Sequence, residues 1–157
     1  MIEQIYTYFS IEMIYLWLNI GVLPFWFLLI FLPETKICKI FVSSIFPILI
    51  FSTIDLYLIF ELYKSDYNLF DSFNLYLGLD ELSDLISDKN FLILFWIHFL
   101  AINLFCGSWI VRDYQRLNIP KQLVIVPLIL TYLIGPLGIF MYWLIRIFFS
   151  KKIDLYD

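Results

Sequence analysis

The sequence has very few of the side chains that build redox, metal or nucleophilic sites. Its 157 residues include two cysteines, Cys38 and Cys106, and one histidine, His98. Cys38 lies near the end of an apolar run and Cys106 lies inside another, so we do not expect them to pair. No CxxC or Cys/His cluster is present either, which argues against the common zinc and redox motifs. We therefore expect neither a metal ion nor a cofactor.

Charged residues are also scarce, at 15% of the chain, and their net charge is −4, which argues against nucleic acid as a partner. Hydrophobic residues make up 62%, whereas soluble domains contain roughly 45–50%. They fall in long runs broken by short polar segments. This pattern predicts an integral membrane protein with membrane lipid as a partner and one transmembrane domain over 1–157. It leaves the oligomeric state open.

Four apolar runs, at about 11–32, 40–60, 91–111 and 122–148, are each long enough to cross a bilayer as a helix, which takes about 20 residues. The predicted fold class is therefore all-α, an integral membrane four-helix bundle. Pro24 in the first run is expected to kink its helix, which neighbouring helices can tolerate, and Pro136 in the fourth run is expected to free the carbonyl of Tyr132 by removing a helix hydrogen bond.

The segment 61–90 differs from the rest, because it holds seven of the 14 acidic residues. Its apolar residues recur at spacings of three and four, which is typical of one face of an amphipathic helix. We expect an acidic amphipathic interfacial helix within 66–88, between the second and third runs, and most clearly over 80–88 with Asp80 as its cap.

Polar side chains inside the runs are the first candidates for a functional site, because they are costly at membrane depth unless paired. In four antiparallel spans, Asn19, Asp55, His98 and Tyr142 would lie at one level. We expect His98 to point into the bundle, within reach of Asp55 or Asn19. Two interpretations stay open: a polar knot that joins the helices, or a ligand-binding or catalytic site.

Further residues are expected to contact a ligand at this level. Phe105 and Trp109 share the helical face of His98, and small residues let a ligand approach the backbone. The expected substrate-binding residues are Asn19, Asn103, Phe105, Trp109, Tyr142, Gly135 and Gly138. By contrast, we expect Asp113, Arg112 and Arg116 to form exposed ion pairs at a helix end, without a catalytic role.

The third and fourth runs also carry a spaced set of aromatic, small and proline residues, and the first run adds two proline motifs. The set consists of Trp96, His98, Phe99, Leu100, Ala101, Leu104, Phe105, Gly107, Trp109, Asp113, Ile119, Pro120, Pro127, Thr131, Gly135, Pro136 and Gly138, with Leu23-Pro24-Phe25-Trp26 and Leu32-Pro33. In combination it resembles the neoxanthin-synthase-like membrane proteins, the abscisic-acid-deficient family. The resemblance covers most of the chain.

The resemblance implies an isomerase that acts on a carotenoid epoxide or a related isoprenoid, as in the conversion of violaxanthin to neoxanthin, in a bacterial inner, thylakoid or plastid membrane. No electrons are transferred in that reaction, so no redox cofactor is needed. An acid and a base are required, and His98 with Asp55 is the expected catalytic pair. Two departures from the family pattern, Asn103 in place of an acid and Ser108 in place of a basic residue, favour the alternative of a non-catalytic carotenoid-binding, lipid-binding or structural membrane protein. A transporter or channel ranks lowest, because the sequence shows no inverted repeat.

Overall fold

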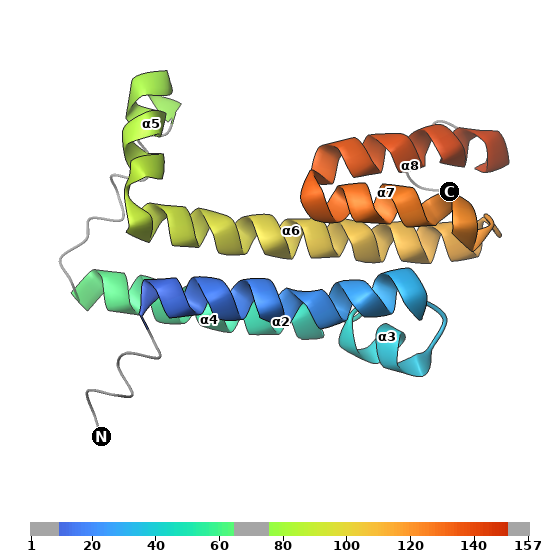
Figure 1. Cartoon of the computed structure of the whole chain (residues 1–157), viewed down its shortest axis with the longest axis horizontal. Coiled ribbons are helices and arrows are strands. Elements are labelled where there is room, and N and C mark those ends of the chain that lie inside the picture. Colours follow the sequence, from blue (N-terminus) through green and yellow to red (C-terminus); the bar gives the residue numbers. More distant parts are fainter. Residues whose placement is uncertain (1–9, 65–75, 151–157) are drawn as a thin grey trace. The chain divides into compact units, whose positions relative to one another are not determined.

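The computed structural model describes residues 10–64 and 76–150 (Figure 1). Within these two ranges every regular element is an α-helix, which confirms the all-α prediction. The helices are α2 (Ile11–Phe31), α3 (Lys36–Phe41), α4 (Phe46–Lys64), α5 (Leu79–Ser87), α6 (Lys89–Arg116), α7 (Lys121–Leu133) and α8 (Gly135–Ser150). The chain forms two compact units: Met1–Gly21 with Ile48–Phe99, and Val22–Pro47 with Leu100–Asp157. The assignment of 1–157 to one transmembrane domain stays a prediction.

Three segments of the described chain are long and apolar enough to cross a membrane: Ile11–Phe31, Lys36–Lys64 and Lys89–Arg116. They correspond to the first three predicted runs. The second run is not one helix over 40–60, because α3 ends at Phe41 and α4 begins at Phe46. Pro47 explains where α4 begins, since a residue without an N–H is accommodated in the first turn of a helix.

The prediction of one helix over 122–148 is wrong. The chain breaks at Ile134 (φ −143°, ψ 76°) and forms two helices, α7 and α8, which run antiparallel beside each other (Figure 1). Pro136 falls in the first turn of α8, where its missing N–H is tolerated, so it starts a helix instead of removing a hydrogen bond inside one. With 13 and 16 residues, these helices are about 20 and 24 Å long, shorter than the roughly 30 Å hydrocarbon core. A four-helix bundle is therefore not confirmed.

Glycines allow the α7–α8 hairpin to pack closely in the second unit. A Cβ on Gly138 would lie 2.2 Å from the backbone nitrogen of Thr131, and a Cβ on Gly135 would lie 2.2 Å from Oδ1 of Asn103 in α6. Both distances are far below normal contact, so neither position accepts a larger residue without a shift of its neighbour. The two glycines act as helix contact points within this unit.

The second unit also contains the end of α6, which runs to Arg116 and not to about 111. Asn118 adopts a left-handed conformation (φ 52°) just after the helix. The backbone N–H of Ile119 donates to the carbonyl of Tyr114 (2.9 Å), and that of Asn118 donates to Gln115 (3.3 Å). This is a Schellman-type end, in which Asn replaces the more usual Gly.

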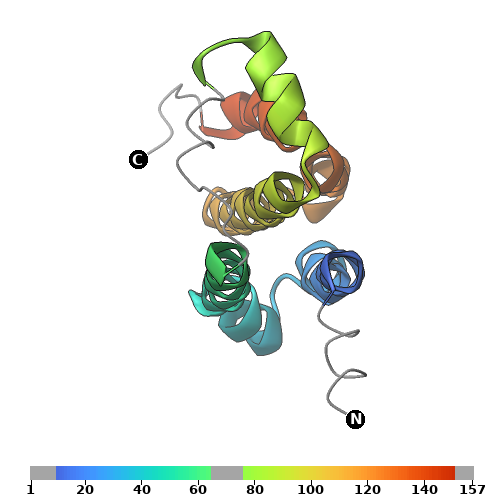
Figure 2. The same cartoon turned by 90° about the vertical axis from the view of Figure 1, so that its left-hand side faces the viewer.

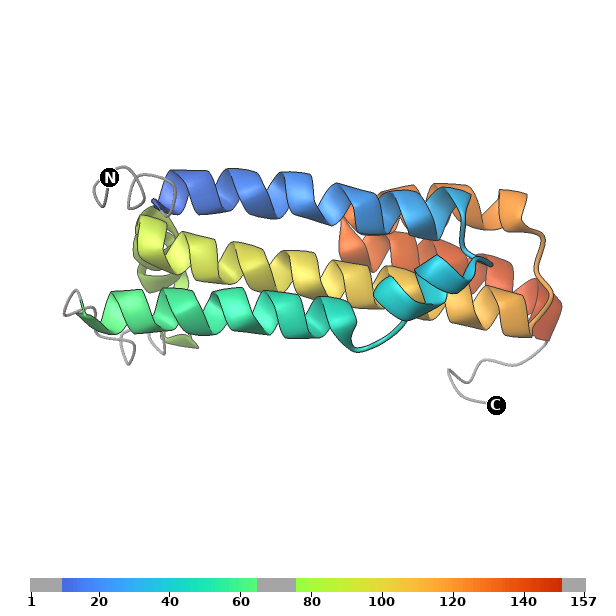
Figure 3. The same cartoon turned by 90° about the horizontal axis from the view of Figure 1, so that it is seen from below.

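The first unit consists of the N-terminal part of α2, most of α4, α5, and α6 up to Phe99. In this unit the α2 and α4 segments run alongside the α6 segment (Figure 3). Nζ of Lys89 in α6 lies 3.0 Å from Oε1 of Glu12 in α2, and the rings of Tyr15 and Trp96 lie 5.8 Å apart. The unit therefore brings side chains of α2 and α6 together.

Helix α5 in the first unit confirms the helix predicted over 80–88, and it runs across the direction of α6 (Figures 1 and 2). Its cap is Gly78, without a side-chain hydrogen bond, so Asp80 lies in the first turn and is not the cap. None of its residues is buried. The predicted residues 66–75 lie outside the described ranges, and the placement of α5 at a membrane surface stays a prediction.

Replacing Gly138 with alanine should destabilise the protein by about 1–3 kcal/mol, because the new methyl group collides with the backbone of Thr131. The matched control is Gly21→Ala in α2, where nothing lies within 4 Å of the added Cβ. Thermal unfolding in detergent, followed by circular dichroism, measures both changes. Equal stability of the two variants would contradict the close packing of α7 and α8.

Candidate functional site

His98 and Asp55 face each other in the first unit, from α6 and α4. Nε2 of His98 lies 3.8 Å from Oδ2 of Asp55, which is within ion-pair range but longer than a hydrogen bond. Nδ1 of His98 lies 2.8 Å from the carbonyl oxygen of Leu94. Because that carbonyl can only accept, Nδ1 carries its hydrogen, and the lone pair of the neutral ring is on Nε2. The nitrogen that can take up a proton is therefore the one nearest the carboxylate.

From the sequence we expected the His98 side chain to point into the interior of the helices, but it does not. It is 61% exposed, whereas the Asp55 side chain is 21% exposed. The expected proximity to Asp55 is present, so an acid–base pair does exist, but its imidazole lies at the outer surface of the described chain. An apolar molecule can reach such a group without entering a helix bundle.

Two further features of the first unit lie outside this pair. The side-chain amide of Asn19 donates to the carbonyl of Tyr15 in its own helix (2.7 Å), so Asn19 does not complete a polar cluster around His98. Next to His98 in the sequence, the rings of Trp96 and Phe99 stack at 5.2 Å. The unit therefore offers aromatic surface and one polar pair.

A second polar group lies in the second unit, where Asp113 is 5% exposed and both Tyr142 and Arg146 are 0% exposed. The hydroxyl of Tyr142 and Nε of Arg146 donate to Oδ2 of Asp113, at 2.7 and 2.8 Å. Nη2 of Arg116 donates to Oδ1 at 2.7 Å, and the Trp109 ring packs edge-on against Tyr142 at 5.7 Å. The expectation that Asp113 forms only exposed ion pairs is therefore wrong.

Tyr142 pairs with Asp113 in the second unit, whereas His98 and Asp55 belong to the first unit. Its hydroxyl contacts Asp113 near the C-terminal end of α6, whereas His98 lies in the N-terminal half of that helix. The reversal of the chain at Ile134 is the reason, because it carries Tyr142 back toward the end of α6. The expected level of four polar residues thus reduces to the His98–Asp55 pair.

The other predicted binding residues of the second unit take part in packed contacts between helices. Asn103 is buried, at 4% exposed, and lies directly over Gly135, while Gly138 lies over Thr131. The side-chain nitrogen of Asn103 has no hydrogen-bond partner among the residues that the structure describes. We expected Phe105 to line an interior cavity. Its side chain is 60% exposed, so it does not.

Comparison with known proteins identifies the family. The sequence profile of the ABA4-like family, described as ABA DEFICIENT 4-like, matches residues 13–142. The chain belongs to this family. No curated protein and no solved structure matches it. Membership confirms the resemblance drawn from the sequence motifs, and together with three helices long and apolar enough to cross a membrane it fits a membrane protein of the ABA4-like family.

Sequence reasoning missed the pairing of Asp113 with Arg146 in this ABA4-like protein. A single-helix interpretation of 122–148 placed Arg146 at the opposite end from Asp113. One signal could have found the pair: Arg146 is the only charged residue in the apolar stretch 122–149. An arginine in such a stretch needs a carboxylate partner. The profile match ends at 142, so it covers Asp113 and Tyr142 but not Arg146.

Replacing Asp113 with asparagine should destabilise the protein by about 3–5 kcal/mol, because it leaves the buried guanidinium of Arg146 without a balancing charge. The matched control is Asp80→Asn on exposed α5, which should change stability by at most about 0.5 kcal/mol. Unfolding in detergent by chemical denaturant measures both. A double variant, Asp113→Leu with Arg146→Met, should recover most of the loss, and a fully additive loss would argue against the pair.

Proposed function

We propose that this ABA4-like protein is a membrane-embedded isomerase that acts on a carotenoid epoxide or a related isoprenoid, with His98 and Asp55 as its acid and base. The observation that carries the proposal is the 3.8 Å separation of Nε2 and Oδ2 on two apolar helices, with the imidazole 61% exposed. A pair in this setting is accessible to an apolar substrate that is dissolved in the bilayer.

The chemistry needs one proton to be given and one to be taken. Protonated Nε2 of His98 donates to the epoxide oxygen as a carbon–oxygen bond breaks, and the Asp55 carboxylate takes a proton from a polyene carbon as the allene forms. Return of that proton from Asp55 to Nε2 restores the pair. Atoms and electrons therefore balance without a cofactor, and each transfer is ordinary general acid–base catalysis.

Aromatic side chains elsewhere in the first unit suit a long unsaturated substrate. The stacked rings of Trp96 and Phe99, with Tyr15 against Trp96, present aromatic surface from the same unit as His98 and Asp55. Aromatic faces pack well against extended conjugated chains. The side-chain amide of Asn19 does not compete for the pair, since it is bonded to its own helix.

A second function, non-catalytic binding of a carotenoid or lipid, is favoured by Asn103. The family resemblance implies an acid at this position, and an amide neither donates nor accepts a proton in catalysis near neutral pH. In that case His98 and Asp55 hold the polar end group of a pigment that remains unchanged. Purification in mild detergent followed by an absorption spectrum detects such a bound pigment.

Expression in cells that accumulate violaxanthin, followed by pigment chromatography, tests the isomerase. Wild-type protein should form an allenic product, and both His98→Ala and Asp55→Asn should reduce its formation by about 10²–10⁴-fold, the usual contribution of general acid–base catalysis. Asn19→Ala is the matched control, because its amide contacts only its own helix, and it should retain conversion.

The outcomes separate the two functions. Unchanged violaxanthin across all variants, together with a pigment that co-purifies with wild-type protein but not with His98→Ala, supports binding alone. Full conversion by His98→Ala would remove this residue from the mechanism. Recovery of conversion by His98→Gln would show that the imidazole acts through a hydrogen bond and not through proton transfer.

A further inference from the structure

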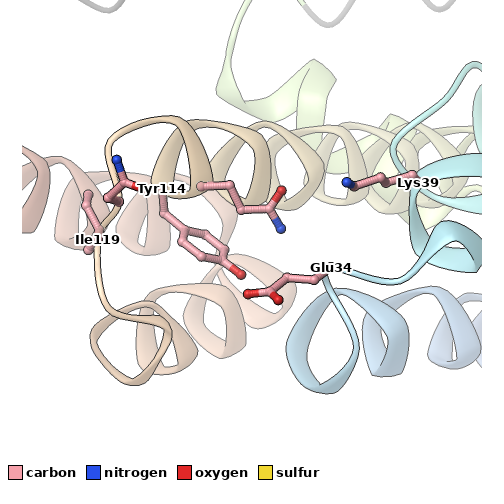
Figure 4. Close-up of a pocket in the computed structure, with 6 residues that line it drawn as sticks. Glu34, Lys39, Tyr114 and Ile119 are labelled. Carbon is pink, nitrogen blue, oxygen red and sulfur yellow. The ribbon is translucent and has the colours of Figure 1, made fainter.

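A hollow of about 560 Å³ in the second unit lies between the turn that follows α2, helix α3 and the C-terminal end of α6 (Figure 4). Its charged lining residues, Glu34 and Lys39, are exposed at the surface. The hydroxyl of Tyr114, which also lines it, is fully buried. This lining selects no ligand, so we turn to the exposed helix of the first unit.

Helix α5 has one apolar face and one acidic face. Because successive residues of a helix are about 100° apart, its apolar residues fall within one arc and its acidic residues fall opposite. The apolar arc consists of Leu79, Leu82, Leu85 and Ile86, and the acidic arc consists of Asp80, Glu81 and Asp84. None of these side chains is buried, and Leu79 is 81% exposed. The apolar face therefore remains open to a partner.

The joint between α5 and α6 holds the two helices across each other (Figures 1 and 2). One residue, Asp88, separates Ser87 at the end of α5 from Lys89 at the start of α6. Its backbone is extended (φ −77°, ψ 120°), and its Oδ1 accepts a hydrogen bond from the backbone N–H of Asn90 at 2.7 Å. This bond caps the start of α6. Where α6 spans a bilayer, the joint places α5 along the membrane surface.

The basic residues that flank this segment in the sequence do not neutralise the acidic face. Helix α5 itself contains no lysine or arginine. Nζ of Lys89 lies 3.0 Å from Oε1 of Glu12 in α2, and Nζ of Lys64 lies 3.1 Å from Oε1 of Glu61 in α4. Both cations therefore already have a carboxylate partner. A helix with this charge is repelled by an anionic lipid surface and not by a zwitterionic one.

We propose that the apolar face of α5 docks on a lipid surface without net charge, in the leaflet where α6 begins, and that anionic lipid displaces it. The apolar side chains enter the boundary between headgroups and acyl chains, and the carboxylates stay in water. Interfacial helices commonly carry lysine and arginine on the polar face. With carboxylates there instead, α5 responds to the surface charge of the membrane. This docking is separate from the proposed isomerase and does not depend on it.

Site-directed fluorescence of the full chain in vesicles tests the docking. The background is Cys106→Ala, because the remaining Cys38 is 0% exposed and escapes labelling. An environment-sensitive fluorophore is attached through Ile86→Cys on the apolar face or through Asp84→Cys on the acidic face. In phosphatidylcholine vesicles, nitroxide-labelled lipid should quench the label at position 86 at least about threefold more than the label at position 84.

Vesicles of equal parts phosphatidylcholine and phosphatidylglycerol then test the response to charge. They should reduce quenching at position 86 at least about threefold. Salt at about 1 M shortens the Debye length to about 3 Å and should restore the quenching. Removal of the three charges, with Asp80→Asn, Glu81→Gln and Asp84→Asn together, should restore it at low salt. The matched control, Asp80→Glu with Glu81→Asp and Asp84→Glu, keeps the charges and should respond like wild type.

Several results would overturn the proposal. Quenching at position 86 that is equal in the two kinds of vesicle excludes a response to lipid charge. Quenching that is absent from both shows that α5 lies in water or under another part of the protein. Equal quenching at positions 84 and 86 contradicts a lipid-facing side, and a loss that salt does not reverse contradicts charge repulsion. Pigment conversion reports separately on the isomerase.

Discussion

The ion pair between Asp113 and Arg146 sets the architecture of the second unit. Two fully desolvated charges are tolerated only when each meets the other with good geometry and further hydrogen bonds. Asp113 meets this condition because Tyr142, Arg146 and Arg116 all donate to its carboxylate. For Arg146 to arrive there, the chain after α7 must return to the end of α6, and the break at Ile134 makes this possible.

Asp113 and Asp55, two carboxylates that pair with a base on apolar helices, differ in what they can do. Asp113 has donors on both oxygens and almost no exposure, so its partners are fixed and it is suited to a structural role. Asp55 has one partner at 3.8 Å, and that partner is largely exposed. Incomplete satisfaction costs stability but leaves a proton acceptor and donor accessible. A carboxylate whose hydrogen bonds are all made, such as Asp113, is suited to packing. A carboxylate that keeps an accessible oxygen, such as Asp55, is suited to proton transfer.

Local properties of the sequence predicted most of the helices, because the length and periodicity of an apolar run depend only on neighbouring residues. The runs that became α2 and α6, and the amphipathic helix α5, were of this kind. The break before Pro136 could not be derived in the same way, since a proline in an apolar run is compatible with a kink or a new helix. The partner of Arg146 and the exposure of His98 depend on contacts between distant segments. They follow from the arrangement of the helices and not from any single run.

The return of α8 to the end of α6 also gathers positive charge at one end of the second unit. Lys36, Lys39, Arg112, Arg116 and Lys121 lie at this end of the helices, Arg146 joins them through Asp113, and Lys151 and Lys152 follow Ser150 in the sequence. Loops rich in Lys and Arg stay on the side from which a chain is inserted. A hairpin in place of a fourth span therefore concentrates positive charge at one end of this unit, the kind of bias that sets the orientation of a membrane protein.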